Sequence, residues 1–581
     1  MTALAALLVV VAALVAACGS SGSGDATTTG AATGGGTTAA AGGNYLDGGF
    51  AAHQEPVKGG TLQMAMNDNI DCWNGLSYYG ISWSVFYFMA RGLYGYPNTV
   101  ESPATDQMQP DLAADMPTVS DDGKTVTVKL RAGLTFPDGS LVTAKDVKAT
   151  FEYILDPNIQ CSTGGPPASG YYGVIDGASD YMTAMTDSKG KTNPGISGIT
   201  AVDDLTTEFK LGKVDGSFTR ALAMGWAFIR PASTEHKVTA TPPPYVGPYK
   251  ITNYTPDKSV TVEREPTWAA NVAAGVPEVA DENNIDGFEL QIGVPDDIQL
   301  AKLKNNEIDI TFDGSAPSGS DVPAVANDPA FKDRFFSTPD AAVDYGVFRT
   351  NKAPFDKVEL RQAVNYAIDR EAIVKIIGGS LSRSPWSQIL SQNLLADQPT
   401  DLYEYDPAKA QELLKTAGVA APEVTLVHFA DDPAPEVAAS VKENLEAVGF
   451  KVKLKGLSAD VFYGFLADPK SNYDMAIAGW GQDYSDATTF YVPLLSCGSG
   501  SNYGQWCDKA FDAKVQEINL LPPGADRTAQ YAQLSTDTAL NSAPWWTVDL
   551  RRKVSFISTR VGNYVWGPSK QFYFGSYFIK G

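Results

Sequence analysis

The chain has few of the residues that most enzymes and nucleic-acid-binding proteins need. Its 581 residues include three histidines, and 44 Lys and Arg stand against 67 Asp and Glu, for a formal net charge of −23. This acidity argues against nucleic acid or anionic lipid as partners, because both attract clustered basic side chains. The sequence has no G-x-S-x-G, H-E-x-x-H or G-x(4)-G-K-[ST] motif. We therefore expect a binding protein, not an enzyme, with no cofactor or metal and with a cationic or zwitterionic ligand.

The N-terminal region has no segment that could form a folded core. Residues 3–17 form an apolar run that is too short to span a membrane but typical of a signal peptide, although no Lys or Arg precedes it. Small residues before Cys18 resemble the lipobox of bacterial lipoproteins, in which the Cys thiol is acylated after cleavage. We expect a signal peptide over 1–17 and a lipidated Cys18 followed by a flexible Gly/Ser/Thr/Ala-rich linker, together residues 18–56. An ordinary signal peptide with a chance cysteine is the alternative.

Cysteine is also scarce, and export determines its expected use. If Cys18 carries lipid, four cysteines remain, and an exported protein is expected to use them in disulfides. Cys497 and Cys507 flank a Gly/Ser/Asn-rich loop, so we predict that they are bonded, which leaves Cys72 and Cys161 for each other. Zinc binding is the competing interpretation, but the sequence has no C-x-x-C spacing and its three histidines are scattered.

Hydrophobic periodicity predicts a mixed α/β protein whose length suits two or three folded units. Segments 59–66 and 125–130 alternate like strands, and Thr143 with Asp146 resembles a capping box at the start of a helix. A second helix is predicted from the N-cap Asp356 to Gly378. A third is predicted after the N-cap Asp406, with Pro407 in its first turn.

The C-terminal half has the pattern of a β-α-β unit. Residues 424–429 and 450–457 are predicted strands, and residues 434–448 between them a helix, so the two strands should be parallel. A further buried strand is predicted over 473–480, and Asp483 lies just past its carboxyl end. Ligands of open α/β sheets bind at such carboxyl ends. Asp483 is therefore the first candidate for a ligand contact.

Five blocks of sequence resemble one family, the extracytoplasmic solute-binding proteins of the peptide/nickel class (family 5), which serve ABC importers. The blocks are QPDLAADMPTVSDDGKTVTVKLRAGLTFPDGSLVTAKDVKATFEYI (109–154), VGPYKITNYTPDKSVTVEREPTW (246–268), LRQAVNYAIDREAIV (360–374), YDPAKAQELLKTAG (405–418) and YDMAIAGWGQDYSDATTF (473–490). They occur in the family's order, and the stretch from 479 to 507 is similar to dipeptide- and oligopeptide-binding lipoproteins. The match weakens after Gly379 and across 160–198.

This resemblance implies a fold and a domain organisation. The fold is α/β, two-lobed and periplasmic-binding-protein-like, of type II and the peptide-binding class, with an extra small domain on the N-terminal lobe. The implied parts are lobe I, the extra domain II, lobe III and a hinge where the chain crosses between the lobes near 346 and 549. Their boundaries are 57–98, 199–345 and 550–581 for lobe I, 99–198 for domain II and 346–549 for lobe III.

The resemblance also implies a function and a set of ligand contacts. The chain would be a monomeric extracytoplasmic lipoprotein that captures a di- or oligopeptide by hinge closure and delivers it to an ABC permease, with the lipid as its only membrane attachment. An oligosaccharide or metal chelate as ligand, or a role in peptide sensing, is the alternative. In relatives an acid at the position of Asp483 pairs with the peptide's ammonium group; here Asp483 could instead cap a helix or brace a turn. The other candidate ligand contacts are Trp480, Tyr484, Tyr78, Trp83 and, for the peptide carboxylate, Arg383.

Overall fold

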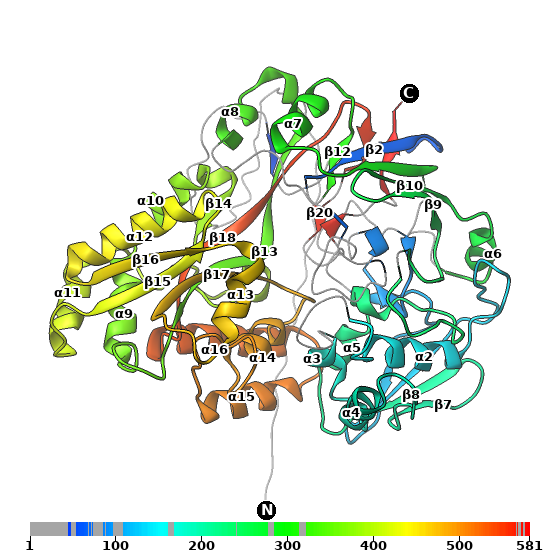
Figure 1. Ribbon diagram of the computed structural model, residues 1–581, viewed down its shortest axis with the longest axis horizontal. Helices are drawn as coiled ribbons and strands as arrows, with labels where there is room; N and C mark the ends of the chain where they lie inside the picture. The colour runs from blue at the N-terminus through cyan, green and yellow to red at the C-terminus, as the bar shows by residue number, and fades with distance from the viewer. Residues whose placement is uncertain are drawn as a thin grey trace, which may run out of the picture. The chain divides into compact units, whose positions relative to one another are not determined.

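The structure is a computed structural model in which the residues from Asn44 onward form one compact unit. It describes residues 45–47, 54–67, 69–70, 73, 85–87, 89–96, 108–160, 168–239, 241–276, 284–312, 321–564, 566–567, 571–572 and 576–580. Three larger sheets organise this unit, and each is packed against its own helices or loops (Figure 1). Of the residues predicted to have a function, Cys18, Cys72, Tyr78, Trp83 and Cys161 lie outside the described residues.

The largest sheet has seven strands in the order β14-β18-β13-β17-β15-β16, with β1 beside β13. β15 pairs in parallel with both β16 and β17, whereas β13 runs antiparallel to β17 and β18. The strands are β1 (Tyr45–Asp47), β13 (Phe335–Phe348), β14 (Arg383–Pro385), β15 (Glu423–Phe429), β16 (Lys451–Leu457), β17 (Met475–Gly481) and β18 (Trp545–Phe556).

Helices cover both faces of this sheet and bury two separate apolar cores. One core contains apolar residues of α9 (Val358–Ala367), α10 (Arg370–Ile376), α11 (Pro407–Thr416) and α12 (Ala434–Val448). The other contains apolar residues of α13 (Ala459–Ala467), α14 (Thr488–Leu495), α15 (Lys509–Asn519) and α16 (Ala525–Asn541). The sheet is therefore the middle layer of an α/β/α arrangement.

Two smaller sheets lie in the rest of the unit. The five-stranded sheet has the order β12-β2-β11-β10-β9, and the four-stranded antiparallel sheet has the order β5-β6-β8-β7. Their strands are β2 (Thr61–Ala65), β5 (Thr118–Val119), β6 (Thr125–Lys129), β7 (Ile199–Ala201), β8 (Thr206–Lys210), β9 (Tyr249–Thr255), β10 (Ser259–Arg264), β11 (Gly287–Gln291) and β12 (Ile310–Thr311). The helices beside them are α2 (Ala144–Ile154), α3 (Ser169–Tyr172), α4 (Ala178–Ser188), α5 (Phe218–Ala221), α6 (Trp268–Ala273), α7 (Asp296–Lys304) and α8 (Val322–Ala326). Three pairs of short strands complete the described part: β3 (Tyr94–Gly95) with β4 (Gln109–Pro110), β19 (Val561–Gly562) with β22 (Phe578–Ile579), and β20 (Trp566–Gly567) with β21 (Gln571–Phe572).

Most elements predicted from periodicity and caps are confirmed. Thr143 and Asp146 form the capping box of α2, the Asp406 carboxylate accepts the Lys409 N–H at the start of α11, and β15, α12 and β16 form the predicted β-α-β unit. The helix predicted from Asp356 to Gly378 is wrong in two respects. The structure has two helices there, and the N-cap of the first is Lys357. The chain turns after Ile368, and the Asp369 carboxylate caps the second helix by accepting the Ala372 N–H at 2.9 Å.

The predicted domain boundaries stay a prediction, and two features bear on where they would fall. β8 pairs with β6, and β7 pairs with β8, so the four-stranded sheet extends beyond the boundary predicted at residue 198. β13 and β18 are long, and their pairing is irregular between Pro339 and Val343. Residues 340–342 of β13 face Arg551 alone, which forms a β-bulge in the middle of the two strands.

Candidate functional site

The carboxyl end of β17 carries the first predicted ligand contact, Asp483. Its side chain is 8 % exposed, and its Oδ2 accepts hydrogen bonds from the Tyr171 hydroxyl and, at 2.9 Å, from the Thr489 hydroxyl. The Thr489 Oγ1 also accepts the Asp483 N–H at 2.8 Å. Thr489 belongs to α14, directly after the β17 loop, whereas Tyr171 belongs to α3, more than 300 residues earlier in the chain. Asp483 is thus braced within its own loop and also contacts a distant segment.

Two further aromatic rings lie beside Tyr171, which donates to this carboxylate. The Tyr171 ring lies 5.4 Å from the ring of Trp226 and 6.0 Å, edge to face, from that of Tyr484. Tyr484 is 3 % exposed, and its hydroxyl lies 3.1 Å from the Thr488 Oγ1. Burial and the nearby acids raise the pKa of Tyr484, so its hydroxyl stays neutral. Tyr484 packs in the same apolar core as the four-stranded sheet, although its backbone follows β17.

Trp480, also predicted as a ligand contact, points into a core. It packs among the residues of α13–α16, and its indole N–H donates to the Thr489 carbonyl oxygen at 3.0 Å. That bond fixes the loop that carries Asp483. The structure thus brings Trp480, Asp483 and Tyr484 together, with Trp480 in a supporting position.

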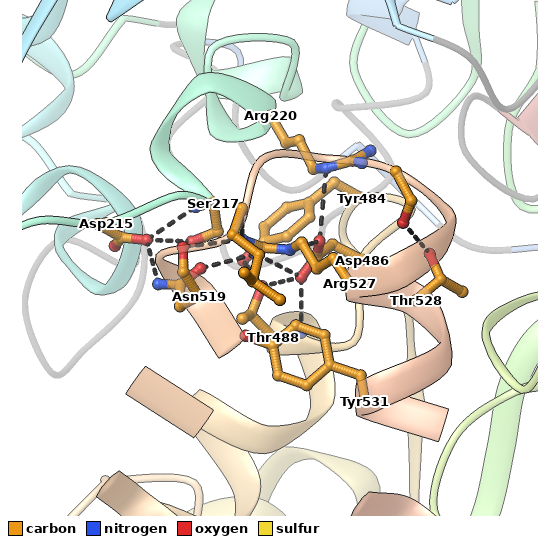
Figure 2. A network of polar contacts seen from close by, with 12 residues as sticks. Asp215, Ser217, Arg220, Tyr484, Asp486, Thr488, Asn519, Arg527, Thr528 and Tyr531 are labelled. Carbon is orange, nitrogen blue, oxygen red and sulfur yellow. Dashed lines mark hydrogen bonds and ion pairs between the residues drawn. The ribbon is translucent and has the colours of Figure 1, made fainter. Parts of the chain in front are cut away.

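Asp486, three residues after Asp483, is the centre of a polar network that joins two distant parts of the chain (Figure 2). Arg527 binds it with both arms of its guanidinium: Nε lies 2.8 Å from Oδ2 and Nη2 lies 3.0 Å from Oδ1. Arg220 approaches from the other side, with Nε 3.5 Å from Oδ2. Burial opposes the charge on Asp486, but the two guanidiniums and the Thr488 hydroxyl outweigh it and lower the pKa of Asp486. The carboxylate stays ionised in a nearly dry setting.

A second bridge lies beside this network. The Asn519 amide donates to Asp215 Oδ1 at 2.9 Å, and the Arg527 Nη1 donates to the Asn519 carbonyl oxygen, also at 2.9 Å. Gly216 lies directly against this bridge, since a Cβ at that position would be 2.1 Å from the Asn519 carbonyl oxygen. The segment 215–220 and the segment from Asp483 to Arg527 are therefore closely packed against each other at Gly216.

Arg383, predicted to bind a peptide carboxylate, lies in a different cluster. Its Nε is 3.0 Å from Asp549 Oδ1 and 3.6 Å from Asp344 Oδ2. A ligand carboxylate would have to compete with both acids, so this role of Arg383 stays a prediction.

The structure confirms the predicted disulfide between Cys497 and Cys507. Within the described ranges there is no group of three or more His, Cys, Asp or Glu side chains that could hold a metal ion. Among the same residues no helix combines the length and apolarity needed to cross a membrane.

Sequence reasoning did not find Tyr171, Arg220, Asn519 or Arg527. Tyr171 lies in a loop-rich stretch where the family resemblance is weak, and Arg220, Asn519 and Arg527 lie in α5, α15 and α16, whose sequences carry no motif. Their only sequence signal is residue type, since an arginine or amide side chain that becomes buried needs polar partners, but the sequence does not say which ones.

Comparisons with known proteins identify the family to which the chain is similar. Residues 107–502 match the model of the bacterial extracellular solute-binding proteins, family 5 Middle. The chain is 28 % identical over 447 residues to the di/tripeptide-binding protein 1 of Pseudomonas aeruginosa, which covers 71 % of this chain and 76 % of that protein. It is 28 % identical over 486 residues to heme-binding protein A of Haemophilus influenzae, which covers 78 % of this chain and 80 % of that protein.

Solved structures show the same fold. The clavulanic acid biosynthesis oligopeptide binding protein 2 superposes with a TM-score of 0.83 at 22 % identity, covering 93 % of this chain and 99 % of that one. The peptide complex of a periplasmic binding protein from Helicobacter pylori superposes with a TM-score of 0.68 at 19 % identity, covering 90 % of this chain and 99 % of that one. The predicted two-lobed α/β fold is confirmed. Since the family model matches well over half of its residues, the chain belongs to the bacterial extracellular solute-binding proteins of family 5.

Proposed function

We propose that this protein is the substrate-binding lipoprotein of an ABC importer, and that it captures a di- or oligopeptide by closure of its two lobes and delivers it to the permease. The position of Asp483 is the observation that carries the proposal. Its carboxylate lies at the carboxyl end of β17 and contacts Tyr171 of a segment far away in sequence. A buried carboxylate at such a meeting point suits the ammonium group of a peptide.

Closure is proposed to act through β13 and β18. Their bulge at 340–342 interrupts the ladder in the middle of both strands, where few backbone hydrogen bonds resist bending. The Asp486 network then joins the two sides in the closed form, since Arg220 and Arg527 reach Asp486 from opposite segments. A ligand would favour closure by binding the closed form more tightly than the open one.

Calorimetry with a defined peptide tests the ammonium contact. Native mass spectrometry of the purified chain first identifies a retained peptide. Replacing Asp483 by Asn removes one partner of a buried ion pair, which costs on the order of 3–5 kcal/mol, or more than a hundredfold in affinity. N-acetylating the peptide removes the other partner, so the Asn variant should lose little more affinity on acetylation than it has already lost.

Asp431 offers a matched control for this substitution. It lies two residues past the end of β15, as Asp483 lies two residues past the end of β17, but it is exposed. Asp431→Asn should leave peptide affinity unchanged. If the losses from Asp483→Asn and from acetylation add, Asp483 does not hold the ammonium group. If Asp483→Asn lowers the thermal midpoint but keeps the affinity, the residue only braces its loop.

One alternative ligand is supported by an observation. Heme-binding protein A of Haemophilus influenzae matches a larger share of this chain than the di/tripeptide-binding protein does, at the same identity. A metal chelate is therefore a second candidate ligand. Titration of the purified chain with haem, followed by absorbance, would support this alternative if binding is saturable and if no peptide is retained.

A further inference from the structure

A second cluster of charges, outside the site described above, lies on β13, β14 and β18. Asp344 and Asp549 are direct partners in the ladder between β13 and β18, and Arg383 faces Arg551 across the neighbouring ladder. Arg551 donates to Asp344 Oδ1 from Nε at 3.0 Å and from Nη2 at 2.5 Å. Arg383 forms ion pairs with both acids, and Asp549 is fully buried. Two carboxyl groups are thus held side by side between two guanidiniums.

The cluster adjoins the bulge. Arg551 is the residue that faces residues 340–342, and its neighbour Arg552 donates to the carbonyl oxygen of Ser337 on the far side of the bulge. The carbonyl oxygen of Ala341, inside the bulge, accepts the N–H of Gln482 at 2.9 Å. Gln482 immediately precedes Asp483. A change in the bulge therefore reaches the ligand contact through one backbone hydrogen bond.

β17 also touches the cluster. A Cβ at Gly479 would lie 2.2 Å from the Arg551 Nη2 and 2.7 Å from the Asp344 Oδ1, so these groups rest against the bare backbone of β17. The cluster therefore lies in direct contact with the strand that ends before Asp483.

The pKa values of the two acids are shifted in opposite directions. Burial and the charge of Asp344 raise the pKa of Asp549 well above its usual range. Burial also opposes the charge on Asp344, but the Arg551 and Arg383 guanidiniums outweigh it and lower the pKa of Asp344. Like charges directly opposite in a ladder are destabilising, so this arrangement favours one proton on the pair.

We propose that the Asp344–Asp549 pair is a proton-dependent switch that sets the balance between the open and closed lobes. With one proton on the pair, β13 and β18 stay paired beside the bulge and favour the closed form proposed above. Loss of that proton places two negative charges opposite each other, and the strands next to the bulge separate. The proposal rests on the proposed closure through β13 and β18, and it adds a dependence on the acidity outside the cell.

The groups around the pair determine whether closure weakens as pH rises or as pH falls. The charged and titratable groups that bear on it are Arg383 of β14, Arg551 and Arg552 of β18, Asp340 of β13 and Tyr463 of α13. The charge of Asp344 raises the pKa of Arg551, and burial raises the pKa of Tyr463. The proton on Asp549 is therefore the one that leaves as pH rises, and closure weakens in that direction. A pKa difference of one unit between the two forms shifts the ratio of closed to open molecules about tenfold.

Small-angle X-ray scattering of the full, ligand-free chain from about pH 5 to about pH 9 tests the switch. We expect the radius of gyration of the wild type to rise with pH as the closed fraction falls. The Asp549→Asn variant has an uncharged side chain at this position at every pH. Its radius of gyration should therefore stay small over the whole pH range. Asp309→Asn is the matched control, because Asp309 is another fully buried acid whose pKa burial raises, but it directly precedes β12 and accepts the Gln63 N–H of β2. The radius of gyration of the Asp309→Asn variant should rise with pH as it does in the wild type.

A flat wild-type profile overturns the proposal, and so does a pH-dependent radius that survives in Asp549→Asn or disappears in Asp309→Asn. If Asp549→Asn does not fold, infrared spectroscopy of the wild type decides. The carbonyl band of a protonated carboxyl group should fade over the pH range in which the radius rises, and a band that stays constant contradicts the switch. All of these measurements are made without ligand. Their results therefore test the switch whether or not the chain binds peptides.

Discussion

Gly216→Ala is a sharp test of lobe closure, because it adds one methyl group at the tightest point between segments 215–220 and 519–527. The new Cβ would lie 2.1 Å from the Asn519 carbonyl oxygen and 2.6 Å from the Arg527 Nη1. The φ angle of Gly216 is not in the left-handed region, so alanine adds no backbone strain and acts only through this contact. Overpacking of this kind costs about 1–3 kcal/mol.

If only the closed form contains this contact, that cost appears in ligand binding. About 1–3 kcal/mol corresponds to a loss of about 5- to 150-fold in affinity. Isothermal calorimetry with the retained peptide measures the loss, and scattering of the ligand-bound chain should show a more open molecule. The thermal midpoint of the empty protein should change little.

Gly212→Ala is the matched control for this prediction. A Cβ there would meet the Val174 carbonyl oxygen at 3.7 Å, which is an ordinary contact, and Gly212 also lacks a positive φ. It should leave affinity and scattering at the wild-type values. The reasoning is refuted if Gly216→Ala lowers the thermal midpoint and leaves the affinity unchanged, because the contact would then be part of the fold in both forms.

Three further predictions concern the anchor, the disulfide and the Asp486 network. Cys18→Ser should abolish metabolic labelling by a fatty-acid analogue, and labelling that persists in the variant would contradict lipidation at this residue. Replacing Cys497 and Cys507 together by Ser should lower the free energy of unfolding by about 3 kcal/mol in the chain-entropy model, measured by denaturant titration, whereas an unchanged midpoint would show that the loop needs no bridge. Asp486 has a lowered pKa in the folded state, so its contribution to stability is complete above the ordinary aspartate pKa of about 3.9 and disappears as pH falls through the folded value. Arg527→Met should reduce this acid sensitivity in thermal melts, and an unchanged slope would show that other acids dominate.

The sequence predicts the local structure well because its signals are local. Asp406 and Pro407 mark the start of α11, and Gly449, with a positive φ, marks the end of α12. The break between α9 and α10 was missed because both segments have the same apolar periodicity, and one capping acid, Asp369, decides between one helix and two.

Only part of the site can be predicted from the sequence, because some of its contacts join segments that are far apart in the chain. Asp483 could be selected because strand ends and ligand crevices coincide in α/β sheets. Its partner Tyr171 could not, because a hydrogen bond across more than 300 residues depends on how separate cores pack. The pairing of Asp344 with Asp549 is equally hidden, since it depends on the register of two strands 200 residues apart.

The pairing of β13 with β18 brings the two ends of the segment 348–544 close together. Val347 and Trp545, at its two ends, are partners in one ladder, so their Cα atoms are about 5 Å apart. A segment that leaves and re-enters a sheet at neighbouring points can be exchanged for the equivalent segment of a relative without moving either splice point. Such a chimera would carry the relative's β17 and the loop after it on this chain's own β2–β12 framework. If the proposed function holds, recombination between paralogous genes would then change the ligand in a single step.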